Sequence, residues 1–335
     1  MLKDALVRLA AAGNLSAADA AASLGEIMDG LASPAQIAAF VTALRMKGET
    51  VDEIAGCARA MRERMVRVDA GADTVLDTCG TGGDGLGTFN ISTVTAFVVA
   101  ACGVRVAKHG NRAASSKCGS ADLLEALGVK LENPKEKLEK ILREVGLAYL
   151  HAPNFHPAMK HAGPVRKELG FRTVFNILGP LCNPAGANVQ VVGLFSAALC
   201  RPYAEVLRAL GSRRAFVVHG HGGLDEFSTT GDNAVVELRD GRTSELVIGP
   251  AAAGLPAAKA SDLLGGGPAE NAAIAREVLS GAKGPRRDVV ILNAAVALVA
   301  AGAAEAPRDG AAKAAVALDS GAARRKLEDL AAATQ

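Results

Sequence analysis

The chain has no tryptophan, only two tyrosines and nine phenylalanines among its 335 residues. Proteins that bind single-stranded nucleic acid stack the bases on aromatic side chains, and few such side chains are present here. Charges of the two signs also nearly balance, with 37 lysines and arginines against 35 aspartates and glutamates. The composition therefore does not favour a nucleic-acid partner or a membrane partner.

Cysteine occurs six times, and no two cysteines stand in a C-x-x-C pair. Most zinc sites of known spacing and the thioredoxin-like redox sites depend on such pairs, so we expect reduced, mostly buried thiols. No uninterrupted apolar run reaches the ~18 residues that a membrane-spanning helix needs. From these absences we expect a cytoplasmic protein.

Acidic residues are missing between Gly85 and Ala121, although the same interval holds four cations, namely Arg105, Lys108, Arg112 and Lys117. Glycine-rich loops at 80–87 and 110–119 lie at either side of its central apolar segment. Glycines let backbone N–H groups approach an anion closely, and a following helix start adds further N–H donors and a positive dipole end. The interval therefore predicts a polyphosphate site.

The first ~68 residues show helix signals and no strand signal. Capping patterns at Ser16–Asp19, Ser33–Gln36 and Thr50–Glu53 open three helices after an amphipathic helix at Leu2–Ala12. We expect residues 1–68 to form a small helical domain.

From Val75 onward, short β-branched runs alternate with helical patterns, which predicts an α/β domain over 69–335 with a central, mostly parallel sheet flanked by helices. Two strands around Asp240-Gly241 read as a hairpin. The last third reads as helical, with helices expected at 268–279, 288–301 and 311–332.

The loop Gly80–Gly85, GTGGDG, formally matches the dinucleotide pattern G-x-G-x-x-G. That interpretation needs an acid about twenty residues further on for the ribose, and Arg105 stands there instead, so only an NADP variant stays open. No Lys-Ser/Thr pair follows the glycines, which excludes a Walker A loop. A tight structural turn is the other alternative.

Two further stretches carry ligand-binding chemistry. Residues 108–117, KHGNRAASSK, place cations, hydroxyls and a glycine at a strand end, a combination typical of phosphate sites, with a solvated basic loop as the alternative. Asp225 and Glu226 follow the strand expected at 215–219 and predict a Mg²⁺ site, unless they form a solvated turn or a helix N-cap. A zinc site from His219 and His221 lacks a third ligand nearby.

A fourth stretch, 156–181, places Arg166 on the charged face of an expected helix. An exposed helical arginine is the commoner outcome. A functional arginine at this position is suited to pair with a substrate carboxylate.

Several motifs occur together and in a fixed order: GTGGD, N-x-S-T, KHGNR-x-x-SS, GSAD, R-x-x-L-G-x-R-T-x-F-N-x-L-G-P-L and G-L-D-E. By these motifs the chain resembles the anthranilate phosphoribosyltransferase family from end to end. The resemblance implies the fold of the pyrimidine nucleoside phosphorylases, with a helical domain, joined by a segment near 153–182, hinged to a larger α/β domain. It also implies a homodimer formed through the helical domains.

The implied reaction transfers the 5-phosphoribosyl group of phosphoribosyl diphosphate to anthranilate, releasing diphosphate, in tryptophan biosynthesis. The family's catalytic residues map onto Lys108, Asn111 and Arg166. The residues that would bind phosphoribosyl diphosphate are Gly80, Gly83, Asp84, Thr88, Asn90, Ile91, Ser92, Thr93, Lys108, His109, Gly110, Asn111, Arg112, Ala113, Ala114, Ser115, Ser116 and Ser120.

The resemblance implies anthranilate contacts from Gly80, His109, Asn111, His156, Arg166 and Pro180. It implies Ser92, Asp225 and Glu226 as ligands of Mg²⁺, with two ions expected per monomer. Departures from the family pattern at Cys118, Cys182 and Gly222 affect none of these positions.

Three alternatives stay open at this point. A pyrimidine nucleoside phosphorylase has the same fold but uses inorganic phosphate, and KHGNR and G-L-D-E count against it. An NADP-dependent oxidoreductase built on GTGGDG and Arg105 gives no role to Asp225 and Glu226. A non-catalytic phosphosugar-binding or nucleic-acid-binding relative is disfavoured by the scarcity of aromatic residues.

Overall fold

The amino-terminal unit consists of four helices with the predicted starts. The computed structural model describes residues 1–113 and 116–335. Ser33 and Thr50 each form a capping box with the residue three positions on, as the sequence predicted. The helices are α1 Leu2–Ala10, α2 Ala17–Met28, α3 Pro34–Lys47 and α4 Val51–Arg64.

The larger unit is built on a seven-stranded sheet of order β3-β2-β1-β4-β5-β6-β7, with its first five strands parallel. The last two strands form the predicted antiparallel hairpin, and both Asp240 and Gly241 adopt positive φ at its turn. The predicted α/β fold is confirmed. The strands are β1 Leu76–Gly80, β2 Val106–Gly110, β3 Leu147–His151, β4 Val189–Gly193, β5 Arg214–His219, β6 Asn233–Arg239 and β7 Arg242–Ile248.

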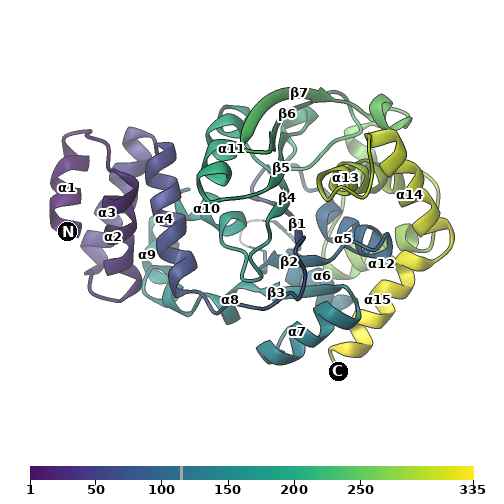
Figure 1. The fold of residues 1–335 in the computed structure, drawn as a ribbon, viewed down its shortest axis with the longest axis horizontal. Helices are drawn as coiled ribbons and strands as arrows, with labels where there is room; N and C mark the ends of the chain where they lie inside the picture. Colours follow the sequence, from purple (N-terminus) through teal and green to yellow (C-terminus); the bar gives the residue numbers. More distant parts are fainter. Residues whose placement is uncertain (114–115) are drawn as a thin grey trace.

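Helices cover both faces of this sheet, as Figure 1 shows. α5, α12, α13, α14 and α15 cover one face, and α11 lies on the other face, toward the helical unit. The bounds are α5 Ile91–Ala101, α6 Ser120–Ala126, α7 Lys135–Glu144, α11 Cys200–Ala209, α12 Pro268–Leu279, α13 Pro285–Ala300, α14 Pro307–Asp319 and α15 Ala322–Ala333. Short 3₁₀ turns are η3 Ala197–Leu199, η4 His221–Gly223, η5 Pro250–Ala253 and η6 Ala260–Leu263.

Two sequence-based expectations about elements are wrong. The single helix expected over 311–332 is two helices, because Gly321 adopts a left-handed conformation (φ 71°) between α14 and α15. Strand β3 was not expected at all. Its five residues are all buried, so they show no alternation of polar and apolar side chains.

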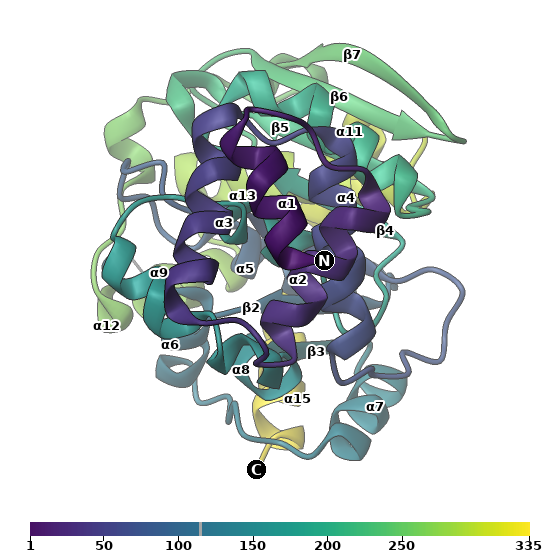
Figure 2. The same cartoon turned by 90° about the vertical axis from the view of Figure 1, so that its left-hand side faces the viewer.

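The chain returns to the helical unit between β3 and β4. This return segment contains α8 Ala152–Phe155, η1 Pro157–Lys160, α9 Gly163–Leu169, α10 Phe175–Leu178 and η2 Gly179–Leu181. α9 packs on α3, as Figure 2 shows, and α10 packs on α4, as Figure 1 shows. Phe40, Leu44 and Leu178 share one apolar cluster with Tyr203 of α11, and the Tyr203 hydroxyl donates to the Ile177 carbonyl (2.9 Å).

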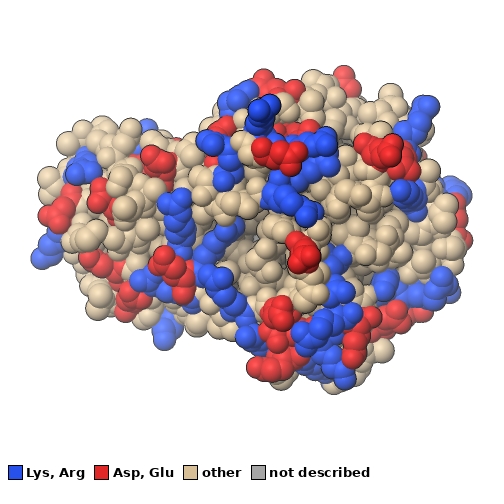
Figure 3. Space-filling view, viewed as in Figure 1, with Lys and Arg blue, Asp and Glu red and all other residues tan. Residues whose placement is uncertain are grey.

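Arginines of α4 connect the helical unit to the end of α11. Arg59 and Arg62 donate to the carbonyls of Ala209 and Leu210 (3.2 and 3.3 Å), where the helix dipole is negative. Basic side chains follow the border between the two units on the face drawn in Figure 3. Among residues 1–113 and 116–335, no helix has both the length and the apolar character needed to cross a bilayer.

Candidate active site

The glycine loops meet at the carboxyl edge of the parallel strands. Gly80 ends β1 and pairs in register with Gly193 at the end of β4, and Gly110 ends the neighbouring β2. A methyl group on Gly193 would collide with the Asp225 backbone, and one on Gly80 with the Asp225 carboxylate. Only glycine therefore lets the 225–226 loop approach this edge, which is where open α/β sheets bind their ligands.

Three carboxylates from two loops converge here. The N–H of Gly82 donates to Asp225 Oδ2 (2.6 Å), and the N–H of Asp225 donates to Asp84 Oδ2 (3.4 Å). Glu226 Oε1 accepts from the N–H of Ser92 (3.0 Å) in the first turn of α5. The strand order thus brings the predicted metal ligands Ser92, Asp225 and Glu226 to one place.

The crowded acidic groups of this cluster favour the binding of a cation. Burial raises the pKa of Asp225, and the neighbouring Glu226 and Asp84 raise it further. Burial also raises the pKa of Glu226 to about 7, although Lys108 and Ser92 act in the opposite direction. Crowded carboxylate and hydroxyl oxygens are the donor set that Mg²⁺ prefers.

Within 1–113 and 116–335, no three His, Cys, Asp or Glu side chains form a complete metal site by themselves. Mg²⁺ commonly takes one or two protein carboxylates and completes its shell with substrate phosphates and water. The residues present therefore fit Mg²⁺ bound together with a phosphorylated substrate.

Lys108 lies beside this cluster at the end of β2 and is only 4 % exposed. Its ammonium donates to the Thr78 carbonyl (2.5 Å) and to Ser92 Oγ (3.3 Å). Asp77 is fully buried nearby, and burial raises its pKa to about 6 against the opposing effect of Lys108. Asn183 donates to Asp77 Oδ2 and to the Ala107 carbonyl, both at 2.8 Å. The N–H of His109 donates to Asp77 Oδ1 (3.3 Å), so this buried network fixes the backbone on either side of Lys108.

The second loop is tied to α5 and α6. Asn90 Nδ2 donates to the Cys118 carbonyl (3.0 Å), and Ser120 Oγ shares a hydrogen bond with the Tyr149 hydroxyl (2.9 Å). Arg112 forms ion pairs with Asp122 and Glu125, and Glu125 is the main reason that its pKa is raised. The arginine is thus already paired with acids of α6, an arrangement the sequence did not reveal.

The other predicted diphosphate-ribose residues are distributed around this edge. Ile91 and Thr93 are buried in the first turn of α5, and Thr88 forms a bridge to Leu264. Asn111 is exposed and accepts from the N–H of Arg112 (2.8 Å) through its side-chain oxygen. Ala113 and Ser116 are described, whereas Ala114 and Ser115 lie outside the described residues.

Arg166 lies on α9, half-buried, with its guanidinium 5.1 Å from the centre of the Phe175 ring. Burial lowers its pKa, and no carboxylate of the described residues forms an ion pair with it. An arginine partly removed from water without an acid partner is suited to hold a carboxylate of a ligand.

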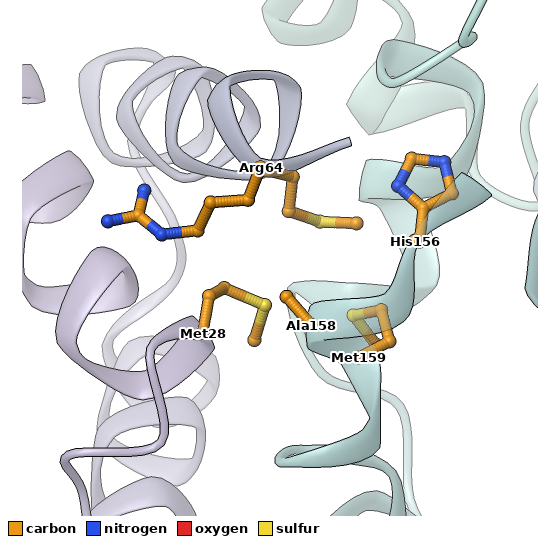
Figure 4. A pocket seen from close by; sticks show the side chains of 6 residues that line it. Met28, Arg64, His156, Ala158 and Met159 are labelled. Carbon is orange, nitrogen blue, oxygen red and sulfur yellow. The ribbon is translucent and has the colours of Figure 1, made fainter. Parts of the chain in front are cut away.

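His109 of β2 meets His156 of the return segment. The Nε2 atoms of His109 and His156 are 3.2 Å apart. Burial lowers the pKa of His109 to about 3 and that of His156 to about 4, so both rings are neutral at physiological pH. Pro180 is buried in η2, in the same segment. Figure 4 shows His156 at the border of a small pocket lined by Met28, Met61, Arg64, Ala158 and Met159.

The NADP interpretation does not fit the geometry. Arg105 precedes β2, so it lies at the amino end of the strands and donates to the Ala70 carbonyl (2.9 Å). The Gly80–Gly85 loop lies at the opposite, carboxyl end. A ribose contact in a dinucleotide site would have to come from the carboxyl end of β2.

The sequence did not reveal the roles of three residues at this edge. Asp77 and Asn183 were assigned no role, although they form the buried network beneath Lys108. Arg172 belongs to the motif R-x-x-L-G-x-R-T but had no expected role of its own, and its guanidinium contacts the Gly83 carbonyl and the Phe195 ring. A cation within a motif that otherwise lines the site was the available signal for Arg172.

Known proteins resemble this chain over its whole length. A model described as "Glycosyl transferase family, a/b domain" matches residues 72–324, and one described as "Glycosyl transferase family, helical bundle domain" matches residues 3–65. The anthranilate phosphoribosyltransferase of Moorella thermoacetica is 54 % identical over 332 residues, which cover 99 % of this chain and 98 % of the relative. The chain belongs to the anthranilate phosphoribosyltransferase family.

Solved members of the family share the fold. The Thermus thermophilus enzyme has a TM-score of 0.94 at 47 % identity, with 99 % of both chains covered. The Saccharomyces cerevisiae enzyme has a TM-score of 0.91 at 32 % identity, covering 99 % of this chain and 97 % of that one. The yeast enzyme was solved in complex with phosphoribosyl diphosphate (PRPP) and Mg, and another of its structures contains 4-fluoroanthranilate.

Proposed function

We propose that this protein transfers the 5-phosphoribosyl group of PRPP to the amine of anthranilate, giving N-(5-phosphoribosyl)anthranilate and diphosphate in tryptophan biosynthesis. The observation that carries the proposal is the meeting of Lys108, the Gly80–Gly85 loop and the Asp225–Glu226 pair at one sheet edge. The names of the full-length relatives support it, as does the yeast enzyme's complex with PRPP and Mg.

Stabilising the departing diphosphate is the main catalytic task. The bond from ribose C1 to the diphosphate oxygen breaks, the bond from C1 to the anthranilate nitrogen forms, and the amine loses a proton. Lys108 and the N–H groups of the glycine loops supply positive charge and donors where the negative charge of the leaving group develops. Ser92, Asp225 and Glu226 would hold two Mg²⁺ ions per monomer, which supply further charge neutralisation when bound.

Arg166 would hold the anthranilate carboxylate and orient the amine toward the ribose. The neutral rings of His109 and His156, together with Gly80, Asn111 and Pro180, would line the path of the aromatic ring. An aromatic amine is a weak base that attacks as the free amine. We therefore assign no dedicated general base.

The test is a mixture of protein, PRPP, Mg²⁺ and anthranilate, in which anthranilate fluorescence should fall as diphosphate is released. The same preparation should not phosphorolyse thymidine. Phosphorolysis of thymidine would instead indicate a nucleoside phosphorylase. Asp225→Asn with Glu226→Gln should abolish Mg²⁺-dependent turnover. The isosteric pair Asp240→Asn with Glu245→Gln on the exposed hairpin is the control and should keep activity. Full activity in the 225–226 variant would contradict the metal assignment.

Three further expectations accompany this function. The division into a helical domain of 1–68, joined by 153–182, and an α/β domain of 69–335 is supported by the packing of α9 and α10 on α3 and α4. A homodimer through the helical unit is supported by its exposed apolar side chains Val7, Leu31 and Met46. A cytoplasmic location stays a prediction from the sequence.

A further inference from the structure

Arg172 occupies an unusual position between the two proposed substrate sites. It follows Gly170, which ends α9 in a left-handed conformation, and it stands six residues after Arg166. Its guanidinium lies 4.0 Å from the centre of the Phe195 ring and donates to the Gly83 carbonyl. No carboxylate of the described residues forms an ion pair with it. The cation is held by a ring and a backbone oxygen alone.

The glycine loop that Arg172 contacts is fixed to the sheet on its other side. The N–H of Thr81 donates to the Gly193 carbonyl (2.9 Å), and Thr81 Oγ1 accepts from the N–H of Phe195 (3.4 Å). The N–H of Gly82 donates to Asp225 (2.6 Å). The next residue, Gly83, has a positive φ, and its carbonyl accepts from Arg172. Arg172 therefore connects the free side of the loop to the segment that carries Arg166.

We propose that Arg172 is a positioning residue that couples diphosphate binding to anthranilate binding, an inference that rests on the proposed function. A diphosphate group in the glycine loop orders Gly83, and Arg172 transmits this order to the end of α9, the helix that carries Arg166. Because part of the ordering cost is then already met, Arg166 binds a carboxylate more tightly. By linkage, anthranilate must strengthen diphosphate binding by the same factor.

Equilibrium titration without turnover measures this coupling. Anthranilate binding is followed by fluorescence in the presence and absence of Mg²⁺ and inorganic diphosphate. Because inorganic diphosphate has no ribosyl group, no transfer can occur. We expect Mg²⁺-diphosphate to tighten anthranilate binding by about fivefold or more in the unmodified protein. In Arg172→Ala this factor should fall to about one, while affinity for anthranilate alone stays within about twofold.

Two further variants separate this role from a folding defect. Phe195→Leu leaves Arg172 in place but removes its ring partner, and it should also lower the coupling factor. Arg172→Lys keeps the charge and a donor for the Gly83 carbonyl without the planar stack, so it should retain part of the coupling. Arg201→Ala removes an exposed arginine paired with Glu245 on the hairpin and should keep the full factor.

The outcomes are distinguishable. If the unmodified protein binds no anthranilate either with or without Mg²⁺-diphosphate, the proposed function fails, and this inference fails with it. If it binds anthranilate and Arg172→Ala keeps the full coupling factor, the inference is overturned while the function stands. A large loss of affinity for anthranilate alone in Arg172→Ala would make it a direct substrate contact, which also overturns the positioning role.

Discussion

At the scale of single residues, the site combines an arginine without an acid partner and two crowded carboxylates that Lys108 offsets only in part. Arg166 is half-buried without an acid partner among the described residues, whereas Asp225 and Glu226 are crowded together with raised pKa values. Each arrangement costs free energy by itself, because a charge removed from water is stable only when it is paired. A ligand of opposite charge would stabilise each arrangement, which is the role that we propose for them.

Arg166→Ala tests the first of these charges. We expect the anthranilate KM to rise by roughly tenfold to a hundredfold, since a charged hydrogen bond to a carboxylate contributes about 1.5–3 kcal/mol. The PRPP KM should change little. Lys167→Ala removes an exposed cation from the same helix and serves as the control. Steady-state kinetics measure both constants, and an unchanged anthranilate KM in Arg166→Ala would remove this residue from the site.

The histidine pair predicts a pH dependence of stability. In the folded protein burial lowers the pKa of His156 to about 4 and that of His109 to about 3, with Lys108 and His151 also acting on His109. The unfolded chain has a histidine pKa near 6.5. Between pH 6.5 and 4 the unfolded chain therefore binds protons that the native protein does not, and the free energy of unfolding falls as pH falls.

Carboxylates also change the free energy of unfolding as the pH falls, so the contribution of the histidine is measured by replacing one ring and comparing the two proteins. His156→Leu should lose less stability than the unmodified protein when the pH falls from 7 to 5, by roughly 1–2 kcal/mol. Urea unfolding at the two pH values measures the difference. Parallel losses in the two proteins would show that His156 does not resist protonation.

At the scale of elements, capping residues and glycines allowed the ends of several helices and turns to be predicted from the sequence. The Ser33 and Thr50 capping boxes set the starts of α3 and α4 correctly, because side chain and backbone satisfy each other locally. Strand β3 could not be recognised, since a short run buried on both faces has no periodicity to distinguish it from a helix segment. Arg112 illustrates the same limit for the site, because its acid partners lie ten and thirteen residues away on α6.

The contact between α2 and α4 depends on Gly56. Alanine would ordinarily strengthen a helix at this position. A methyl group here, however, would collide with the carbonyl of Ala17 and the side chain of Ala20. Gly56→Ala should therefore destabilise the helical unit by about 1–3 kcal/mol, as overpacking does.

Gly163→Ala is the matched control, because space is open around that glycine at the start of α9. Its stability should change by no more than about 0.5 kcal/mol. Thermal unfolding of the two variants measures the difference. Equal stability of both would refute the account of the helix contact.

At the scale of the whole molecule, the site depends on strand order, which no local pattern contains. Asp225 reaches Gly82 across 143 positions because β4 and β5 follow β1 in the sheet. The motifs and the family resemblance predicted which residues would bind ligands, but only the fold shows that these residues lie at one sheet edge. The network of Asp77, Asn183 and Lys108 was beyond prediction, because it forms where the return segment meets β1 and β2.

The association of two copies can be tested on the helical unit. Leu31 and Met46 are 75 % and 83 % exposed there, so a second copy would cover apolar surface. Leu31→Glu with Met46→Glu should convert a dimer into a monomer in analytical ultracentrifugation. Val247→Glu places the same charge on the exposed hairpin of the other unit and should leave the dimer intact. A double variant that stays dimeric would exclude this surface.

The most direct test of the central claim is a crystal structure of the protein with PRPP and Mg²⁺. The account predicts that the diphosphate lies between the Gly80–Gly85 loop and Lys108, with Mg²⁺ bound near Ser92, Asp225 and Glu226. A diphosphate bound elsewhere on the molecule, with these groups contacting only protein and water, would contradict it.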